Sequence, residues 1–215
     1  MAAVATLPKA EHLVVLEDVS WETYERLLAE NNPGRGKRFT YDSGTLQIMV
    51  LSFRHESPNR QLAAIVELVA MEWELDIKLT GSVTVKRPDL YKGLEPDSSF
   101  YIRNAGAIRG KAELDFAIDP APDLVIEVDI TTDSMNKFPI FAAVGVPEVW
   151  RFDGDRVAIH LARGSGYVEA AISEMLAPLS SELLTSFLRT SFEEDRPQWI
   201  RQLRKWAREA RPSTH

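Results

Sequence analysis

Apolar residues recur along this chain at spacings that predict alternating helices and strands. Residues 21–30 follow Ser20, a residue type that favours helix N-termini, and are predicted to form a short amphipathic helix. Its apolar face would consist of Trp21, Tyr24, Leu27 and Leu28. Residues 57–73 are predicted to form the longest early helix, because apolar residues again share one face. That face would consist of Leu62, Ile65, Val66, Val69 and Trp73.

Strands are predicted where apolar and polar residues alternate between turn signals. Residues 37–41 and 45–51 flank Asp42-Ser43-Gly44 and are predicted to form a hairpin. Its second strand is predicted to bury one face, formed by Leu46, Ile48 and Val50, which alternate with Gln47 and Met49. Further extended segments are predicted at residues 76–87, 97–102, 122–130, 148–152, 156–162 and 167–172.

The remaining segments are predicted to be helical or irregular. A helix is predicted at about residues 133–143, where Pro139 would kink or shorten it. Residues 103–121 show no periodic pattern and are predicted to form the one long loop. Residues 180–211 are predicted to be helical.

The order of these elements predicts one mixed α/β domain over residues 18–178. Residues 1–17 show no clear periodicity and are expected to lie loosely on the surface. Residues 179–215 are expected to form a helical tail that packs on the core or on a dimer partner.

Composition and charge exclude several classes of protein. The chain has 215 residues, of which 45% are hydrophobic and 27% charged, values typical of a soluble globular protein. No run approaches about 18 apolar residues, so no membrane span is expected. The absence of cysteine excludes disulfides and thiolate metal sites and fits a cytoplasmic protein. With a net charge of −7, the chain would need a local basic patch to hold nucleic acid, or its acidic groups would be metal ligands.

Residues 122–130, with the sequence PDLVIEVDI, form the clearest predicted strand and carry two acidic side chains. Side chains alternate between the faces of a strand, so Glu127 and Asp129 share a face, about 7 Å apart by strand rise. The opposite face is continuously apolar and consists of Leu124, Ile126, Val128 and Ile130. Two carboxylates this close repel each other and are costly to bury. Exposure to water, pairing with Lys or Arg, or a shared cation such as Mg²⁺ would relieve that cost.

Asp97 and Lys137 are candidates to join these carboxylates. Asp97 begins a predicted extended segment and would reach the same cation if that segment lies beside residues 122–130. Lys137 lies on the next predicted helix and would neutralise developing negative charge or position a water molecule. Together they give the pattern of a metal-assisted hydrolase. The simpler interpretation is a solvated strand face, a turn carboxylate and a surface lysine.

The order of these residues resembles the PD-(D/E)XK nuclease superfamily, and within it the Uma-type restriction endonuclease family. The resemblance extends from Ser20 to about Tyr167. It is carried by Pro96-Asp97, Glu127-Val128-Asp129, Lys137 and Gly145-Val146-Pro147-Glu148-Val149-Trp150. His55-Glu56 is also similar to the family, whose first core helix often supplies a further acid.

This resemblance implies a restriction-endonuclease-like α/β core, in which helices flank a mixed central sheet. It also implies hydrolysis of DNA phosphodiester bonds with Mg²⁺ or Mn²⁺, often by a homodimer. Asp97, Glu127 and Glu56 would bind the metal directly or through water, and the carbonyl of Val128 would complete the shell. We interpret His55 as a local hydrogen-bonding residue.

One position departs from the superfamily pattern. The pattern expects a lysine two residues after the glutamate, where this chain has Asp129. Lys137 is the candidate replacement, and it would orient the attacking water or stabilise the transition state. Asp129 would then be a supporting acid. If Lys137 does not reach the site, a weak or inactive nuclease is expected.

The C-terminal segment has the pattern of a basic amphipathic helix. Its apolar stripe consists of Trp199, Leu203, Trp206 and Ala210. Its basic residues are Arg196, Arg201, Arg204, Lys205, Arg208 and Arg211. Such a helix contacts DNA phosphates or an acidic partner, or it docks on the core with a solvated basic face. We favour docking.

The working hypothesis is therefore a Mg²⁺-dependent endonuclease that acts on DNA. The alternative is a non-catalytic DNA-binding or assembly protein that retains the nuclease fold, and a hydrolase for another phosphoester is a third interpretation. The sequence has no G-x-S-x-G motif, P-loop or dinucleotide-binding glycine pattern, which disfavours serine hydrolases, nucleotide triphosphatases and Rossmann enzymes.

Overall fold

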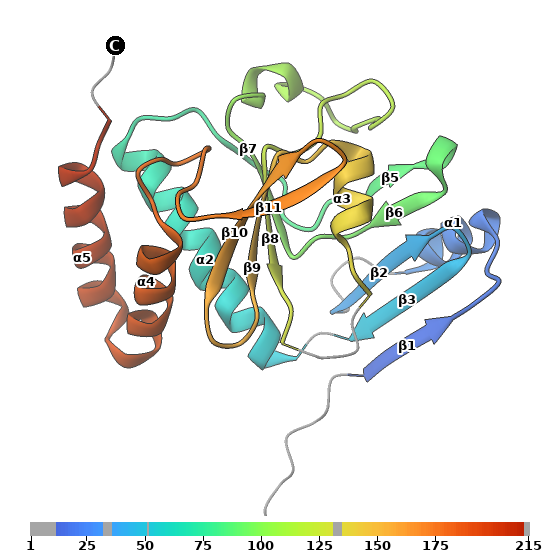
Figure 1. The fold of residues 1–215 in the computed structure, drawn as a ribbon, viewed down its shortest axis with the longest axis horizontal. Helices are drawn as coiled ribbons and strands as arrows, with labels where there is room; N and C mark the ends of the chain where they lie inside the picture. Colours follow the sequence, from blue (N-terminus) through green and yellow to red (C-terminus); the bar gives the residue numbers. More distant parts are fainter. Residues whose placement is uncertain (1–11, 32–35, 51, 131–134, 213–215) are drawn as a thin grey trace, which may run out of the picture.

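The structure, a computed structural model, describes residues 12–31, 36–50, 52–130 and 135–212. These residues form two β-sheets, around which five α-helices and two short 3-10 helices are arranged (Figure 1). The mixed α/β class predicted from the sequence is confirmed. No helix in the described part of the chain is long and apolar enough to cross a membrane.

The N-terminal sheet is entirely antiparallel. Its strands lie in the order β1 (His12–Leu16), β3 (Thr45–Val50), β2 (Lys37–Asp42), β6 (Lys92–Leu94) and β5 (Val85–Arg87). Helix α1 (Trp21–Glu30) packs Trp21 and Tyr24 against Phe39 and Tyr41 on one face of this sheet. The sheet and α1 thus form a small aromatic core of their own.

The central sheet is mixed, as predicted. Its strands lie in the order β11 (Gly166–Ala170), β10 (Val157–Arg163), β9 (Glu148–Phe152), β8 (Leu124–Val128), β7 (Ser98–Tyr101) and β4 (Lys78–Leu79). Among the described strands of this sheet, only β8 and β9 pair in parallel. A parallel pair needs a crossover connection, and α3 (Phe138–Val144) lies within that connection.

Helices cover both faces of the central sheet (Figure 1). On one face, α2 (Phe53–Glu72), α4 (Ser181–Glu193) and α5 (Arg196–Glu209) pack in the same apolar core as Leu124, Ile126 and Val128. On the other face, Val125 packs with α3 residues in a second core. Strand β8 is therefore buried on both sides, with the alternation predicted from its sequence.

The C-terminal helix α5 docks on α2. The indole Nε1 of Trp73 donates a hydrogen bond to the carbonyl of Ala207 at 2.7 Å. Two of the basic side chains of α5, Arg204 and Arg208, pair with Glu72 on α2. Part of the basic face thus contacts acids of the same chain.

Several predicted elements are confirmed with nearly unchanged bounds. They are the helix at 21–30 with Ser20 as its cap, the hairpin of β2 and β3, and strands β8, β9, β10 and β11. The expected loop at 103–121 contains one short 3-10 helix, η2 (Ala105–Ile108), and η1 (Pro88–Leu90) lies between β5 and β6. The tail forms two helices rather than one continuous element, α4 and α5.

The N-terminal segment differs from the expectation. Residues 1–17 were expected to lie loosely, but residues 12–16 form β1, which pairs with β3 at the edge of the N-terminal sheet. Val14, Val15 and Leu16 remain exposed, so β1 has no alternation of buried and exposed positions that a sequence pattern would reveal. Residues 1–11 lie outside the described residues.

Two helices begin at positions other than those predicted. Helix α2 begins one turn before residue 57, and His55 and Glu56 lie in its first turn. Pro58 lies inside the helix, although proline usually marks a helix start. Helix α3 begins at Phe138, with Pro139 in its first turn, so Lys137 is its N-cap residue rather than a residue on its face. Residues 133 and 134, the expected start of that helix, lie outside the described residues.

Candidate active site

A cavity of about 310 Å³ lies where the end of β8 meets the start of α3. Its polar lining comes from the two strands that pair in parallel and from the segment before α3, and Met49 of the N-terminal sheet contributes to its wall. The principal lining residues are Met49, Glu127, Asp129, Lys137, Phe138 and Arg151. The cavity is therefore lined by four of the residues proposed from the sequence, because Val128 also contributes to its wall.

Asp97 and Glu127 are brought together by the pairing of β7 with β8. Asp97 immediately precedes β7, and the antiparallel register of Ser98 with Ile126 places it near the end of β8. Its Oδ2 accepts a hydrogen bond from the backbone amide of Val128 at 2.8 Å. Both carboxylates are buried, with Asp97 and Glu127 each 4% exposed. The strand therefore has no solvated acidic face at Glu127.

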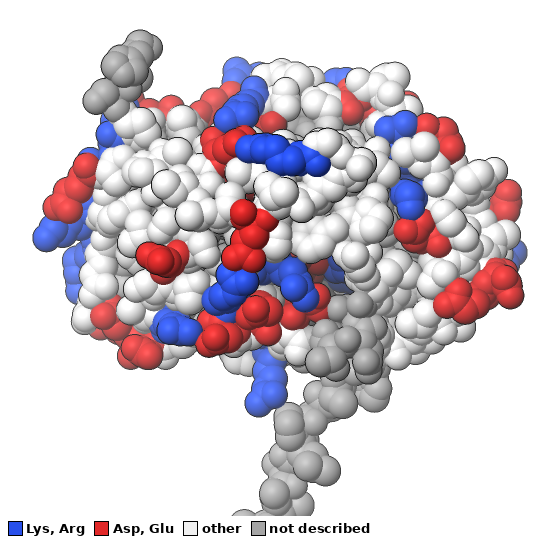
Figure 2. Space-filling model, in the orientation of Figure 1, with Lys and Arg blue, Asp and Glu red and all other residues white. Residues whose placement is uncertain are grey.

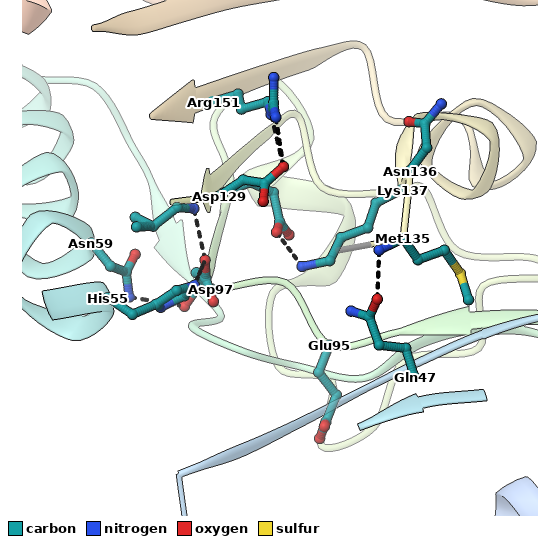
Figure 3. A network of polar contacts seen from close by, with 12 residues as sticks. Gln47, His55, Asn59, Glu95, Asp97, Asp129, Met135, Asn136, Lys137 and Arg151 are labelled. Carbon is teal, nitrogen blue, oxygen red and sulfur yellow. Dashed lines mark hydrogen bonds and ion pairs between the residues drawn. The ribbon is translucent and has the colours of Figure 1, made fainter. Parts of the chain in front are cut away.

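Lys137 completes this group. Its Nζ lies 2.5 Å from Oε2 of Glu127, and its side chain is 13% exposed. Figure 3 shows Lys137 directed toward the region of Asp97 and Asp129. Lys137, which was expected to reach the site from the segment after the strand, thus contacts Glu127 from the N-cap of α3.

The pKa values of these groups reflect burial and mutual charge. Burial raises the pKa of Glu127 to about 7 and that of Asp97 to about 6, and the charge of Lys137 opposes both shifts. Burial also acts to lower the pKa of Lys137, but the charges of Glu127 and Asp97 outweigh it and raise that pKa. Lys137 therefore stays protonated, while both carboxyl groups take up protons more readily than in water.

Asp129 has a different partner. Its Oδ2 accepts two hydrogen bonds from Arg151 on β9, from Nε at 3.1 Å and from a terminal nitrogen at 2.6 Å (Figure 3). Glu127 and Asp129 are thus each paired with a basic side chain, which is one of the three arrangements expected for two neighbouring carboxylates. Asp129 lies at the more open side of the cavity, with a side chain 21% exposed.

Helix α2 holds Asp97 from the other side. The Nε2 of His55 lies 3.3 Å from Oδ2 of Asp97. Asn59, one turn along α2, donates to the carbonyl of Asp97 at 3.2 Å and accepts from the hydroxyl of Ser98 at 2.8 Å. Because α2 begins before Pro58, His55 is on the helix and is directed at the carboxylate, which fixes the position of Asp97.

The N-terminal sheet closes the site from below in Figure 3. Oε1 of Gln47 accepts a hydrogen bond from the amide of Met135 at 2.5 Å, which fixes the segment leading to Lys137. Gln47 and Met49 are buried, whereas Val50 is 38% exposed. The prediction that β3 buries only the face of Leu46, Ile48 and Val50 was wrong, because the other face lies against the site.

Glu56 and Val128, two of the predicted metal ligands, each contact another residue of the chain. Oε1 of Glu56 accepts a hydrogen bond from Nε of Arg60, four residues along α2, at 2.6 Å. The charge of Glu56 is still close enough to raise the pKa of Asp97, after the larger effect of burial. The amide of Val128 donates to Asp97, and the role of its carbonyl stays a prediction.

The donor atoms fit a divalent cation held by two carboxylates. Oε1 of Glu127 is buried and accepts no hydrogen bond from the described residues, beside a second buried carboxylate, Asp97. Mg²⁺ commonly binds one or two carboxylates and keeps several waters. In the described residues, however, no group of three or more His, Cys, Asp or Glu side chains is placed to hold a metal. Water would therefore supply most of the coordination shell.

Sequence reasoning missed the residues that reach the site across the fold. His55 was interpreted only as a local hydrogen-bonding residue. Gln47 was placed on the face of its strand that was not expected to be buried, so the alternation in residues 45–51 gave no signal of its role. No local pattern pointed to the contact between His55 and Asp97, which are 42 positions apart in the chain.

Comparisons with known proteins agree with this architecture. A family model described as "Uma2: Putative restriction endonuclease" matches residues 21–191. A search of curated proteins found no match. Among solved structures, the chain resembles a protein from Anabaena variabilis described as a "putative nuclease belonging to DUF820". The two share 14% sequence identity, and the alignment has a TM-score of 0.55 and covers 79% of this chain and 99% of that chain. At this identity the likeness shows the fold alone.

Proposed function

The chain belongs to the Uma2 family of putative restriction endonucleases, and from this we propose that it is a nuclease. Its substrate would be DNA, and Mg²⁺ or Mn²⁺ would bind in the cavity beside β8. The observation that carries the proposal is the buried group of Asp97, Glu127 and Lys137. Burying two acids and a lysine together costs stability, which proteins tolerate most often at functional sites.

In this proposal Asp97 and Glu127 bind the cation, and neighbouring groups fix the positions of the two carboxylates. The amide of Val128 and the imidazole of His55 fix the carboxylate of Asp97. Lys137 fixes Glu127 through Oε2 and leaves Oε1 available as a ligand atom. When bound, a divalent cation polarises a phosphoryl oxygen and lowers the pKa of a water molecule.

Lys137 has a second role in the proposal. Its protonated amine has three donor hydrogens, so it can bond a phosphate oxygen or the attacking water while it contacts Glu127. A positive charge fixed beside the reacting phosphate stabilises negative charge that develops in the transition state. Asp129 would support the site indirectly, by holding Arg151 at the cavity opening.

Plasmid nicking tests the proposal. Purified protein is incubated with supercoiled plasmid in Mg²⁺, in Mn²⁺ and in EDTA. We expect conversion to open-circular DNA with either cation, none in EDTA, and none with Asp97→Asn or Glu127→Gln. Asp155→Asn is the matched control, because its side chain is 85% exposed on the β9–β10 turn. It should nick like the wild type.

Two other outcomes assign other functions. Binding of DNA without cleavage in either cation would refute the nuclease and support a DNA-binding protein that retains the fold. Cleavage of other phosphoesters, with DNA left intact, would keep the cation-dependent chemistry and change the substrate.

A further inference from the structure

Arg38 on β2 lies on the face of the N-terminal sheet that borders the candidate active site. It pairs across the hairpin with Met49, which lines the cavity, and the next pair on the same face joins Thr40 to Gln47. Cross-strand partners lie on one face of a sheet, so Arg38 shares the face of Met49 and Gln47. The intervening residue Phe39 points to the opposite face, where α1 packs.

The chain that leads to Asp97 runs beside Arg38. Thr40 of β2 pairs with Leu94 of β6, and the amide of Glu95 donates to the carbonyl of Phe39 at 3.1 Å. The chain therefore passes Arg38 as it runs from Leu94 to Asp97. In agreement with this, burial raises the pKa of both Asp97 and Glu95, and the charge of Arg38 opposes both shifts.

The guanidinium of Arg38 has a buried donor with no hydrogen-bond acceptor among the described residues. Its Nε is buried and has no hydrogen-bond partner in the described part of the chain, and one terminal nitrogen donates only to the neighbouring carbonyl of Lys37 at 3.1 Å. A buried donor left unpaired costs free energy, which a bound acceptor would recover. The two basic side chains among the described residues that line the cavity already have carboxylate partners, because Lys137 contacts Glu127 and Arg151 contacts Asp129.

We propose that Arg38 is a phosphate-binding residue of this site and takes a backbone phosphate of the nucleic acid. A guanidinium presents parallel N–H donors that match two phosphate oxygens, and it stays charged at any working pH. This inference rests on the proposed function, because it takes nucleic acid as the ligand. It also gives the N-terminal sheet a role in binding the substrate.

Surface charge makes such a local contact necessary. The chain has a net charge of −7, and on the face shown in Figure 2 acidic and basic side chains are interspersed, with no continuous basic surface. Binding to DNA depends strongly on charges that contact phosphate. With little general attraction, a single arginine on the sheet face beside the site should account for a measurable share of the affinity.

Equilibrium binding to a fluorescein-labelled DNA duplex tests the assignment. Anisotropy is measured in EDTA, where no cleavage occurs, over a series of KCl concentrations. We expect Arg38→Gln to weaken binding about tenfold and to reduce the slope of log affinity against log salt by about one. Arg38→Lys keeps the charge without the parallel donors, so it should keep the slope and recover part of the affinity.

Arg26→Gln is the matched control. It removes the same charge from an exposed position on α1, which covers the opposite face of the same sheet, and should leave affinity and slope nearly unchanged. Thermal unfolding of each variant shows whether it folds. If Arg38→Gln does not fold, Arg38→Lys still tests the assignment.

The outcomes separate this inference from the proposed function. The assignment is overturned if the wild type cleaves DNA in Mg²⁺ and Arg38→Gln or Arg38→Lys binds the duplex as tightly, and with the same salt slope, as the Arg26→Gln control. That result would leave the proposed nuclease activity intact. Arg38-dependent binding without cleavage would support the assignment and refute the nuclease. A wild-type protein that neither binds nor cleaves the duplex would refute both.

Discussion

Replacing Glu127 with glutamine should stabilise the cation-free protein, although it should destroy the proposed activity. Burial raises the pKa of this carboxyl group from 4.5 to about 7, so its ionised form is less favourable in the folded chain than in the unfolded chain. One pKa unit corresponds to about 1.4 kcal/mol, so the penalty is on the order of 3 kcal/mol at pH 8. Glutamine resembles the protonated acid and avoids this penalty. The loss of the attraction between Glu127 and Lys137 is already included in this free-energy penalty, because that attraction lowers the pKa of Glu127.

The effect should depend on pH in a defined direction. A carboxyl group whose pKa is raised on folding costs nothing below its unfolded value of 4.5, and its cost grows as the pH rises to about 7. We therefore expect Glu127→Gln to stabilise the protein by about 1 kcal/mol at pH 5 and about 3 kcal/mol at pH 8. At pH 8 this corresponds to a melting temperature roughly 6–12 °C higher for a protein of this size.

Urea unfolding with EDTA at both pH values measures this effect, and Glu148 provides the control. Glu148 is also fully buried, but its carboxylate accepts four hydrogen bonds, from the indole of Trp150, the hydroxyl of Ser173 and the amides of Glu174 and Met175. Glu148→Gln places an amide donor among these donors and should destabilise the protein by about 1–3 kcal/mol. Destabilisation by Glu127→Gln at pH 8, or a gain equal at both pH values, would refute the reasoning.

Three other predictions follow from the same structure. Lys137→Met should lower nicking by roughly 10²–10³-fold while Mn²⁺ binding persists, as measured by initial rates and by titration; an unchanged rate would remove Lys137 from the mechanism. Leu203→Ala should cost about 2–5 kcal/mol in urea unfolding because Leu203 is fully buried, whereas exposed Arg201→Gln should change little; equal effects would show that α5 is not part of the core. Gly93→Ala should cost about 1–3 kcal/mol in thermal unfolding because its Cβ would overlap the ring of Tyr24, and an unchanged melting temperature would show that the ring can move.

Much of the fold follows from local patterns, and those parts were predictable. The alternation in Leu124–Val128 identified the innermost strand, and the cap at Ser20 located the first helix to the residue. Strand β1 was not predictable, because its exposed apolar residues show no period and its pairing partner β3 lies 30 residues further along the chain. The predicted start of the second helix, at residue 57, was wrong. Pro58 lies inside that helix, because tertiary contacts outweigh the local preference of proline for a helix start.

The candidate site was predictable to the extent that it depends on neighbouring residues of one strand. Glu127 and Asp97 stood out because their types and order fit a known pattern, and Lys137 was selected as the one replacement for the missing lysine. The structure places all three together. Arg38 and His55 reach the site through pairings between distant segments, and such contacts leave no trace in a single sequence.

Binding of Mn²⁺, followed by electron paramagnetic resonance of the free ion, tests whether Asp97 and Glu127 hold a cation. We expect about one bound ion per chain for the wild type and for Asp155→Asn, and none for the double variant Asp97→Asn, Glu127→Gln at the same concentrations. The same occupancy in the double variant, or no bound Mn²⁺ in the wild type, would contradict the claim that these two buried carboxylates hold a catalytic cation.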